Sequence, residues 1–376
     1  MRIAFDARYI EKEGSGVSVY ASHLLYNLFK TNDIEIITIS APDQDINGLC
    51  NIDTENISCP YGIQNHPMQE YWLSFKLPHF LKEKKADILF CPAFIVPLKK
   101  LPIKLGVTIH DFVFRFAPTS MNRRFALYAK FMTNKAVKLS DFIITDTKAI
   151  KDELIDLYEK DPKKVYHVHP GKTFRTFKES KDNSNSSKNS LNALGIRKPY
   201  FLFVGNLEPR KDISRLINLF QRLRKKSEFS DHLLVLCGKK RWQWNKIEPD
   251  IKNNLENVFF TGYVEQEHLE GLYKGCKAVF ATSFYEGFGF PVLEGMQAGK
   301  IVFASSIPTF REIGGKGAVY LDLSDLGASE GIISDTLKNE EKMEIIKKAS
   351  EKRLDDFSWE ESAKKTIDIF KKSLIF

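Results

Sequence analysis

Two short stretches of the sequence combine charged side chains with glycine in a way that suits an anionic ligand. The first, residues 204–212 (VGNLEPRKD), places Gly205 shortly before the adjacent cations Arg210 and Lys211. It lies between a predicted strand and a predicted helix, where backbone N–H groups and the helix dipole favour an anion. Two neighbouring cations beside a closely approaching backbone would fit a diphosphate. An ordinary loop with two solvated cations is the alternative.

The second stretch, residues 284–294 (FYEGFGFPVLE), places two acids eight residues apart around glycines that precede a predicted helix. Pro291 suits the first helical position and Gly299 the position just past the helix end. We expect Glu286 in the loop and Glu294 in the first helical turn. Because a carboxylate near a phosphate is unfavourable, we expect both acids to accept hydrogen bonds from sugar hydroxyls. Dipole-favoured acids at a helix start are the alternative, and they explain Glu294 better than Glu286.

Both halves of the chain alternate short apolar runs, typical of buried parallel strands, with helical patterns. In the first half we predict strands at 3–9, 34–40, 87–91, 105–109, 142–145 and 165–168, and helices at 17–29, 122–139 and 148–158. In the second half we predict strands at 200–204, 233–237, 258–261, 278–282, 301–304 and 318–321. This pattern predicts an α/β protein of two doubly wound Rossmann-like domains that face each other across a cleft, with ligands at the carboxyl ends of the strands.

A polar, low-complexity stretch at 179–192 cannot join a hydrophobic core and suggests the domain boundary. We therefore predict a first domain at 1–178, a linker at 179–198 and a donor-binding domain at 199–358. A final helix, 359–376, follows Ser358, a suitable N-cap residue.

Composition favours a cytoplasmic protein. No run of eighteen apolar residues is present, and the chain opens on a strand pattern without a leader sequence. The five cysteines lie far apart and form no CxxC pair, so neither a disulfide framework nor a zinc site is indicated. The formal charge is +8, of which residues 1–198 carry +7. That excess suggests an anionic partner for the first half, or else a solvated lysine-rich surface.

Taken in order, the motifs resemble the retaining nucleotide-sugar glycosyltransferases of family 4, which have two Rossmann-like domains in the fold called GT-B. The resemblance rests on the two stretches above together with further motifs, namely the loop Gly14-Ser15-Gly16, His110-Asp111, His169-Pro170-Gly171, residues 261–264 (TGYV) and Phe357-Ser358-Trp359. It covers nearly the whole chain. It implies that the last helix crosses back to the first domain.

The resemblance assigns roles to the residues of the two stretches. Arg210 and Lys211 would neutralise the diphosphate and stabilise it as it leaves, next to Gly205. Glu294 would hold the ribose hydroxyls, and Glu286 would contact the transferred sugar.

Further roles follow from the resemblance elsewhere in the chain. Gly16 would let the first domain's backbone approach the phosphates, and His110 would contact the sugar near the reacting carbon. Val264 would line the base, while the N–H groups of Gly289 and Phe290 would approach the distal phosphate or the sugar.

The implied activity is transfer of a hexose, with GDP-mannose as the best guess for the donor, to a glycan or lipid-linked acceptor of a cell-surface polysaccharide. Retention would proceed by front-face attack, so positioning and charge stabilisation would carry the catalysis. Because Arg210 and Lys211 already supply positive charge, we expect no metal or other cofactor. The one Asp-x-Asp triplet, Asp43-Gln44-Asp45, could mark a metal–diphosphate site, but we interpret it as surface.

Other classes of protein fit less well. A dehydrogenase would need a third glycine after Gly16. A glycoside hydrolase or phosphorylase using Glu286 and Glu294 leaves the two anion-suited helix starts unexplained. A non-catalytic sugar-nucleotide-binding protein stays open. A nucleic-acid binder would suit the charge, but no such motif is present.

The predicted helix 122–139 mixes five basic residues with large apolar ones. It could lie on anionic lipid at the inner face of the cytoplasmic membrane, or it could be a core helix with a solvated basic edge.

Overall fold

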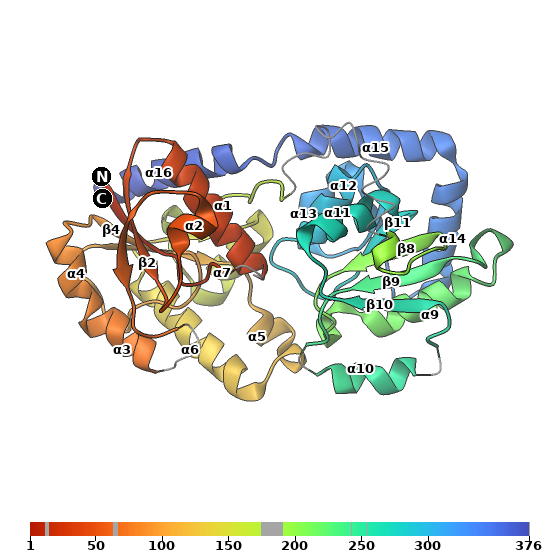
Figure 1. Ribbon diagram of the computed structural model, residues 1–376, viewed down its shortest axis with the longest axis horizontal. Coiled ribbons are helices and arrows are strands. Elements are labelled where there is room, and N and C mark those ends of the chain that lie inside the picture. The colour runs from red at the N-terminus through yellow and green to blue at the C-terminus, as the bar shows by residue number, and fades with distance from the viewer. Residues whose placement is uncertain (12–14, 63–66, 174–190, 242, 253, 376) are drawn as a thin grey trace. The chain divides into compact units, whose positions relative to one another are not determined.

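The computed structural model describes the chain except for residues 12–14, 63–66, 174–190, 242, 253 and 376 (Figure 1). The described residues form two compact units. Unit 1 consists of Met1–Asp111, Leu127–Gly171 and Phe357–Phe376. Unit 2 consists of Phe112–Ala126 and Lys172–Asp356. Most of the predicted linker, 179–198, lies outside the described residues.

Unit 1 is built on a seven-stranded parallel sheet with the order β3-β2-β1-β4-β5-β6-β7. Its strands are β1 (Arg2–Asp6), β2 (Glu35–Ser40), β3 (Glu55–Ser58), β4 (Ile88–Cys91), β5 (Lys104–Ile109), β6 (Phe142–Thr145) and β7 (Val165–His167). Its helices are α1 (Gly16–Lys30), α2 (Ile46–Cys50), α3 (Met68–Phe75), α4 (Leu77–Glu83), α6 (Arg123–Leu139), α7 (Lys148–Tyr158) and α16 (Trp359–Ile375). The boundary between the units falls inside α6.

Helix α16 completes unit 1, although it follows unit 2 in the sequence. Phe370 packs against Phe90 of β4 and Phe142 of β6, with ring centroids 5.2 and 5.7 Å apart. At the start of the helix, Trp359 stacks on His23 of α1 at 5.1 Å. Aromatic packing of this kind buries large apolar areas, so α16 is part of the core of unit 1.

Unit 2 is built on a six-stranded parallel sheet with the order β10-β9-β8-β11-β12-β13. Its strands are β8 (Tyr200–Val204), β9 (Leu233–Cys237), β10 (Val258–Gly262), β11 (Ala278–Ala281), β12 (Val302–Ser305) and β13 (Val319–Leu321). Its helices are α5 (Val113–Phe116), α9 (Ile213–Leu223), α10 (Trp244–Ile251), α11 (Gln266–Gly275), α12 (Phe290–Gln297), α13 (Pro308–Gly314), α14 (Leu326–Lys338) and α15 (Glu340–Leu354).

One face of α9 belongs to the core of unit 2. Apolar residues of α9 recur at three- and four-residue spacing and are all buried against the sheet, namely Ile213, Leu216, Ile217, Phe220 and Leu223. Figure 1 shows helices flanking each sheet. The two Rossmann-like parallel sheets confirm the predicted fold class.

Three local predictions need correction. The first strand ends at Asp6 rather than residue 9, because the chain turns there and Asp6 pairs with the buried Arg8, whose Nη2 lies 2.7 Å from an Asp6 oxygen. The edge strand β3 was not predicted, since its sequence ENIS has only one apolar residue. Helices α3 and α4 were not predicted either.

Candidate active site

The two predicted stretches meet because they follow neighbouring strands at the point where the strand order reverses. The first stretch follows β8 and the second follows β11, and these two strands pair in parallel. In open α/β sheets, ligands bind outside the carboxyl ends of the strands at such a reversal. The topology of unit 2 therefore brings Arg210, Lys211 and Glu286 together.

Glycines let the backbone pack tightly where β8 and β9 end. Gly205 has φ +148° and Gly238 has φ +150°, values that favour glycine. A Cβ at Gly238 would lie 2.0 Å from the carbonyl oxygen of Gly205. At Gly205 a Cβ would have room, with the Lys211 Nζ 3.7 Å away. Gly238 is thus the position that cannot carry a side chain, and nothing in its local sequence indicated this.

A compact ion cluster forms at the centre of the site. Glu286 accepts hydrogen bonds from Lys211 Nζ through one carboxylate oxygen and faces Arg210 Nη1 at 2.6 Å through the other. Arg210 Nε lies 2.6 Å from a carboxylate oxygen of Glu208. Lys211, Glu286 and Glu208 are each 9% exposed. The acids therefore neutralise the cations, a pairing that was not predicted from the sequence.

Electrostatics keep Glu286 ionised. Burial alone would raise the pKa of its carboxyl group, but the charges of Arg210 and Lys211 outweigh burial and lower the pKa to about 2. Such a group cannot donate a proton near neutral pH. The ionised carboxylate can therefore pair with the two cations. It does not suit the role of the general acid in a glycoside hydrolase.

Hydroxyl groups fasten the two loops to each other. Thr282 Oγ1 donates to the carbonyl oxygen of Lys211 at 2.7 Å, and Ser283 Oγ donates to that of Arg210 at 2.9 Å. Thr309 Oγ1 donates to the carbonyl oxygen of Glu286 at 2.8 Å. The backbone that presents the ion cluster is thus fixed on both sides.

Glu294 has its own set of partners. Tyr273 donates its hydroxyl to one carboxylate oxygen at 2.6 Å, and Thr173 donates to the other at 3.1 Å. Burial raises the pKa of Glu294, and these two hydrogen bonds oppose the rise. Tyr273 and Thr173 were missed from the sequence, because each is more than twenty residues away from Glu294.

The start of α12 differs from the prediction. Phe290 is the first helical residue, so Pro291 is the second. Glu294 is therefore the fifth residue and lies beyond the first turn, where the helix dipole does not favour an acid. Gly289, with φ +123°, precedes the helix, and a Cβ there would lie 2.9 Å from the Phe310 ring. Gly299 follows the helix end with φ +67°, as predicted.

Residues 112–126 pack on the same loops. Tyr285 accepts the Phe112 backbone N–H through its hydroxyl at 2.9 Å and stacks on Phe116 at 5.1 Å. Ser120 Oγ accepts the backbone N–H of Arg210 at 2.9 Å. This segment immediately follows the predicted His110-Asp111 motif, and it contacts the ion cluster's own loops.

Gly16 and His110 belong to unit 1. Gly16 is the first residue of α1 and is exposed, whereas Gly14 of the same motif lies outside the described residues. His110 Nδ1 lies 2.6 Å from an Asp146 oxygen, and Nε2 lies 2.7 Å from the Pro92 carbonyl oxygen. Burial lowers the pKa of His110, but the Asp146 carboxylate outweighs it and the net pKa is raised. Asp146 was not predicted as a partner.

The other predicted positions fall as follows. Val264 is buried just after β10 in unit 2. Asp43 and Asp45 are exposed, and Asp45 caps α2 by accepting the Gly48 N–H at 3.0 Å. All five cysteines are buried free thiols. Within the described residues, no group of three or more His, Cys, Asp or Glu side chains is placed to hold a metal ion.

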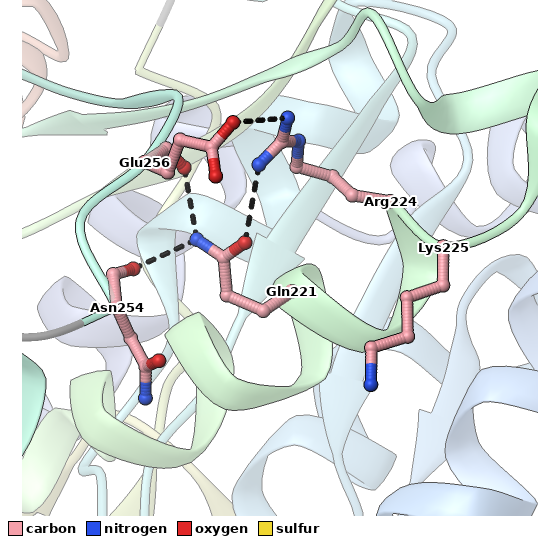
Figure 2. Close-up of a pocket in the computed structure, with 5 residues that line it drawn as sticks. All are labelled: Gln221, Arg224, Lys225, Asn254 and Glu256. Carbon is pink, nitrogen blue, oxygen red and sulfur yellow. Dashed lines mark hydrogen bonds and ion pairs between the residues drawn. The ribbon is translucent and has the colours of Figure 1, made fainter.

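A separate surface pocket lies beside β10, an edge strand of the unit 2 sheet (Figure 2). Gln221 Nε2 donates to the carbonyl oxygens of Asn254 and Glu256 at 2.7 and 2.8 Å, and Arg224 Nη2 lies 3.0 Å from a Glu256 carboxylate oxygen. These contacts join the end of α9 to the segment that enters β10. The pocket is thus a structural junction at the amino ends of the strands, away from the ion cluster.

Family comparisons agree with this architecture. Residues 187–353 match the model described as glycosyl transferases group 1, and residues 14–171 match the model of glycosyltransferase family 4. The chain is 31% identical to the O-antigen chain mannosyltransferase B of Escherichia coli over 46% of its own length. It is 25% identical to the O-antigen chain mannosyltransferase RfbU of Salmonella typhimurium over 68% of its length. The matched part spans 45% and 65% of those two relatives.

The fold is also found in solved structures. The structure of Anabaena Alr3699/HepE in complex with UDP-glucose aligns over 99% of this chain and 100% of its own, with a TM-score of 0.74 and 16% identity. Together the two family matches account for most of the sequence, one for each half. The chain belongs to the group 1 glycosyltransferases, in glycosyltransferase family 4.

Proposed function

We propose that this protein transfers a hexose, in the first place mannose, from a nucleoside-diphosphate donor to a glycan acceptor of an O-antigen-type polysaccharide, with retention of configuration. The observation that carries the proposal is the ion cluster of Arg210, Lys211 and Glu286 at the strand reversal of unit 2. Two relatives are named O-antigen chain mannosyltransferases, which supports mannose and this type of acceptor. A protein of similar fold was solved in complex with UDP-glucose, which supports a nucleotide sugar as the donor.

The donor diphosphate would take the place of the Glu286 carboxylate on the two cations. Arg210 and Lys211 would then stabilise the charge that develops on the leaving phosphate as the C1–O bond breaks. The acceptor oxygen would form the new bond to C1 on the same face, and its proton would pass to the departing phosphate oxygen. Both cations supply charge without a metal ion.

Glu286, once released from the cations, would be free to accept hydrogen bonds from the hydroxyls of the transferred sugar. Glu294, held at both oxygens by Tyr273 and Thr173, would meet the ribose hydroxyls. A buried acid that already accepts two hydrogen bonds keeps its orientation, which favours selective recognition of a diol.

A donor screen tests the proposal. The thermal midpoint is measured with GDP, UDP, dTDP and ADP, and released nucleotide is then measured with the matching sugar donor and a lipid-linked glycan acceptor. We expect one nucleotide to stabilise the protein. We expect Lys211→Ala to slow transfer by raising its activation barrier by about 2–4 kcal/mol. Lys225→Ala, at the exposed pocket in Figure 2, is the matched control and should leave transfer unchanged.

Two results would count against the proposal. Stabilisation by a nucleotide without release from any sugar donor would instead identify a non-catalytic binding protein. Equal transfer rates for Lys211→Ala and the wild type would separate the ion cluster from the reaction.

A further inference from the structure

Helix α3 carries a stripe of large apolar side chains that faces solvent. Met68, Tyr71 and Phe75 are spaced three and four residues apart, so they share one face of the helix. They are 47%, 51% and 54% exposed. Trp72 and Leu73 are buried, and Leu73 lies on the side of the helix away from this stripe. The helix therefore has one apolar face in the core and a second in water.

Helix α6 has a comparable stripe. Leu127 and Phe131, four residues apart, are 69% and 50% exposed, whereas Met132 and Ala136 are buried. Among the described residues, no helix combines the length and hydropathy that crossing a bilayer requires. The exposed side chains of α6 therefore form a surface feature. Helix α6 thus has both a buried core face and an exposed apolar one.

The two helices are neighbours in unit 1. The Tyr128 hydroxyl of α6 donates to the Glu70 carboxylate of α3, and Figure 1 shows both helices along the same side of the unit. We call the exposed residues Met68, Tyr71, Phe75, Leu127 and Phe131 the α3–α6 face. Isolated exposed apolar residues are normal, but a group of this size on adjoining helices indicates an interaction site.

Charge identifies the partner. Helix α6 contains no acidic residue, and Glu70, the one acid of α3, is buried. Lysines flank the exposed rings instead. Lys99 Nζ lies 4.2 Å from the centroid of the Phe75 ring, and Lys135 Nζ lies 5.7 Å from that of Phe131. An acid-free face of this kind is complementary to an anionic surface.

Exposed Lys76, Lys130 and Lys138 lie on the same two helices or directly beside them. Lipid interfaces accept both kinds of group at once, since apolar side chains enter the acyl boundary while lysine ammonium groups stay among phosphates. A soluble polyanion would satisfy the lysines but leave the apolar side chains in water. We propose that the α3–α6 face docks on an anionic lipid bilayer without spanning it.

Co-sedimentation of the full-length protein with vesicles tests this. We expect binding to phosphatidylcholine vesicles that contain phosphatidylglycerol, little binding to phosphatidylcholine alone, and weakening with salt. Leu127→Ser with Phe131→Ser should weaken partitioning by about tenfold or more for each side chain. Lys130→Gln with Lys138→Gln should weaken it by about fivefold per lysine.

Matched controls come from unit 2. Ile345→Ser removes a side chain that is 62% exposed, and Lys225→Gln removes an exposed lysine. Both controls should bind vesicles like the wild type. Circular dichroism melts must show unchanged midpoints for every variant, as expected for surface substitutions. Leu127→Trp adds a readout of depth, because its fluorescence should shift to the blue only on anionic vesicles.

Several outcomes would overturn the proposal. Equal binding to neutral and anionic vesicles, or equal loss in the control variants, would remove the α3–α6 face from membrane binding. Partitioning without a blue shift of Leu127→Trp would reduce the contact to charge alone. A dimer in sedimentation velocity that dissociates in the Leu127→Ser, Phe131→Ser variant, with no vesicle binding, would assign the face to a second copy of the chain.

Discussion

Replacing Glu286 by glutamine would remove the negative charge that Arg210 and Lys211 share. All three side chains are largely buried, so the two cations would be left in a poorly solvated site, where Glu208 still pairs with Arg210. A pKa of about 2 for Glu286, against 4.5 for the ordinary group, corresponds to roughly 3 kcal/mol in favour of the ionised form. Breaking a buried ion pair costs a similar amount. We therefore expect Glu286→Gln to lose about 3 kcal/mol of unfolding free energy at pH 7.

The pH dependence follows from the same group. Because the pKa of Glu286 is depressed in the folded protein, its stabilising contribution is present above the ordinary value of 4.5 and is lost as pH falls toward 2. The wild type should therefore approach the stability of Glu286→Gln as pH falls through this range. Urea unfolding at several pH values measures the difference.

Ligand binding should respond in the opposite direction to stability. In the proposed reaction a diphosphate displaces Glu286 from the cations of the wild type, whereas in Glu286→Gln it meets cations that have lost this counter-charge. We expect the nucleoside diphosphate to bind the variant about tenfold or more tightly, equivalent to roughly 1.4 kcal/mol. Transfer should nevertheless fall, since the proposed contact of Glu286 with the sugar would be lost. Isothermal titration calorimetry and the transfer assay separate the two effects.

Glu330 offers a matched control. It also sits between an arginine and a lysine, with Arg222 Nε at 2.9 Å and Lys226 Nζ at 3.4 Å, but these cations are considerably more exposed. Glu330→Gln should cost about 1 kcal/mol or less and leave nucleotide binding unchanged. The reasoning fails if Glu286→Gln binds the nucleoside diphosphate more weakly than the wild type, because the carboxylate would then be a ligand contact and not a competitor.

Three further changes test other parts of the site. Gly238→Ala places a Cβ 2.0 Å from the Gly205 carbonyl oxygen and should cost about 2 kcal/mol or more in chemical unfolding, while Gly331→Ala in α14, where a Cβ meets nothing within 4 Å, should be neutral or stabilising. Tyr273→Phe removes the hydroxyl that donates to Glu294, so it should cost about 1.5–3 kcal/mol of unfolding free energy. The pKa of Glu294 should rise further, because this hydrogen bond lowers it. Calorimetry at two pH values should therefore show that nucleotide binding is weakened most at low pH. Asp212→Asn removes a buried carboxylate whose pKa is raised to about 6 by burial. The cost of ionising this group in the folded protein grows as pH rises from about 4 to 6. In urea titrations the variant should therefore gain roughly 1–2 kcal/mol of unfolding free energy at pH 7 and nothing below pH 4.

Much of the fold could be predicted because buried parallel strands have continuous apolar sequences. Strands β8 and β9 and helix α7 begin and end at the predicted residues. Edge strand β3 has no such run, because three of its four residues are exposed. Local pattern therefore identifies the interior of a sheet better than its margin.

Three members of the ion cluster were predictable, but their pairings were not, and neither were Tyr273 and Thr173 beside Glu294. Arg210, Lys211 and Glu286 were recognisable from residue type and from their place after a strand. The ion pairs between them join residues 75 or more positions apart and depend on β8 lying beside β11. Both acids were expected on sugar hydroxyls because a carboxylate beside a phosphate is unfavourable. In the structure Glu286 instead pairs with the two cations.

The place of α16 has a consequence for the order of folding during synthesis. Unit 1 contains the first strand of the chain, yet its core includes Phe370, which the ribosome adds after the whole of unit 2. Residues 112–126 belong to unit 2 but are made before the rest of it, and Phe116 stacks on Tyr285, which is made much later. Domains usually fold as units from the N-terminus during translation. Unit 2 is complete only when residue 356 has been made, and unit 1 only when residues 357–376 follow. Both units should therefore stay open to chaperones and proteases until late in synthesis, and unit 1 until residues 357–376 emerge.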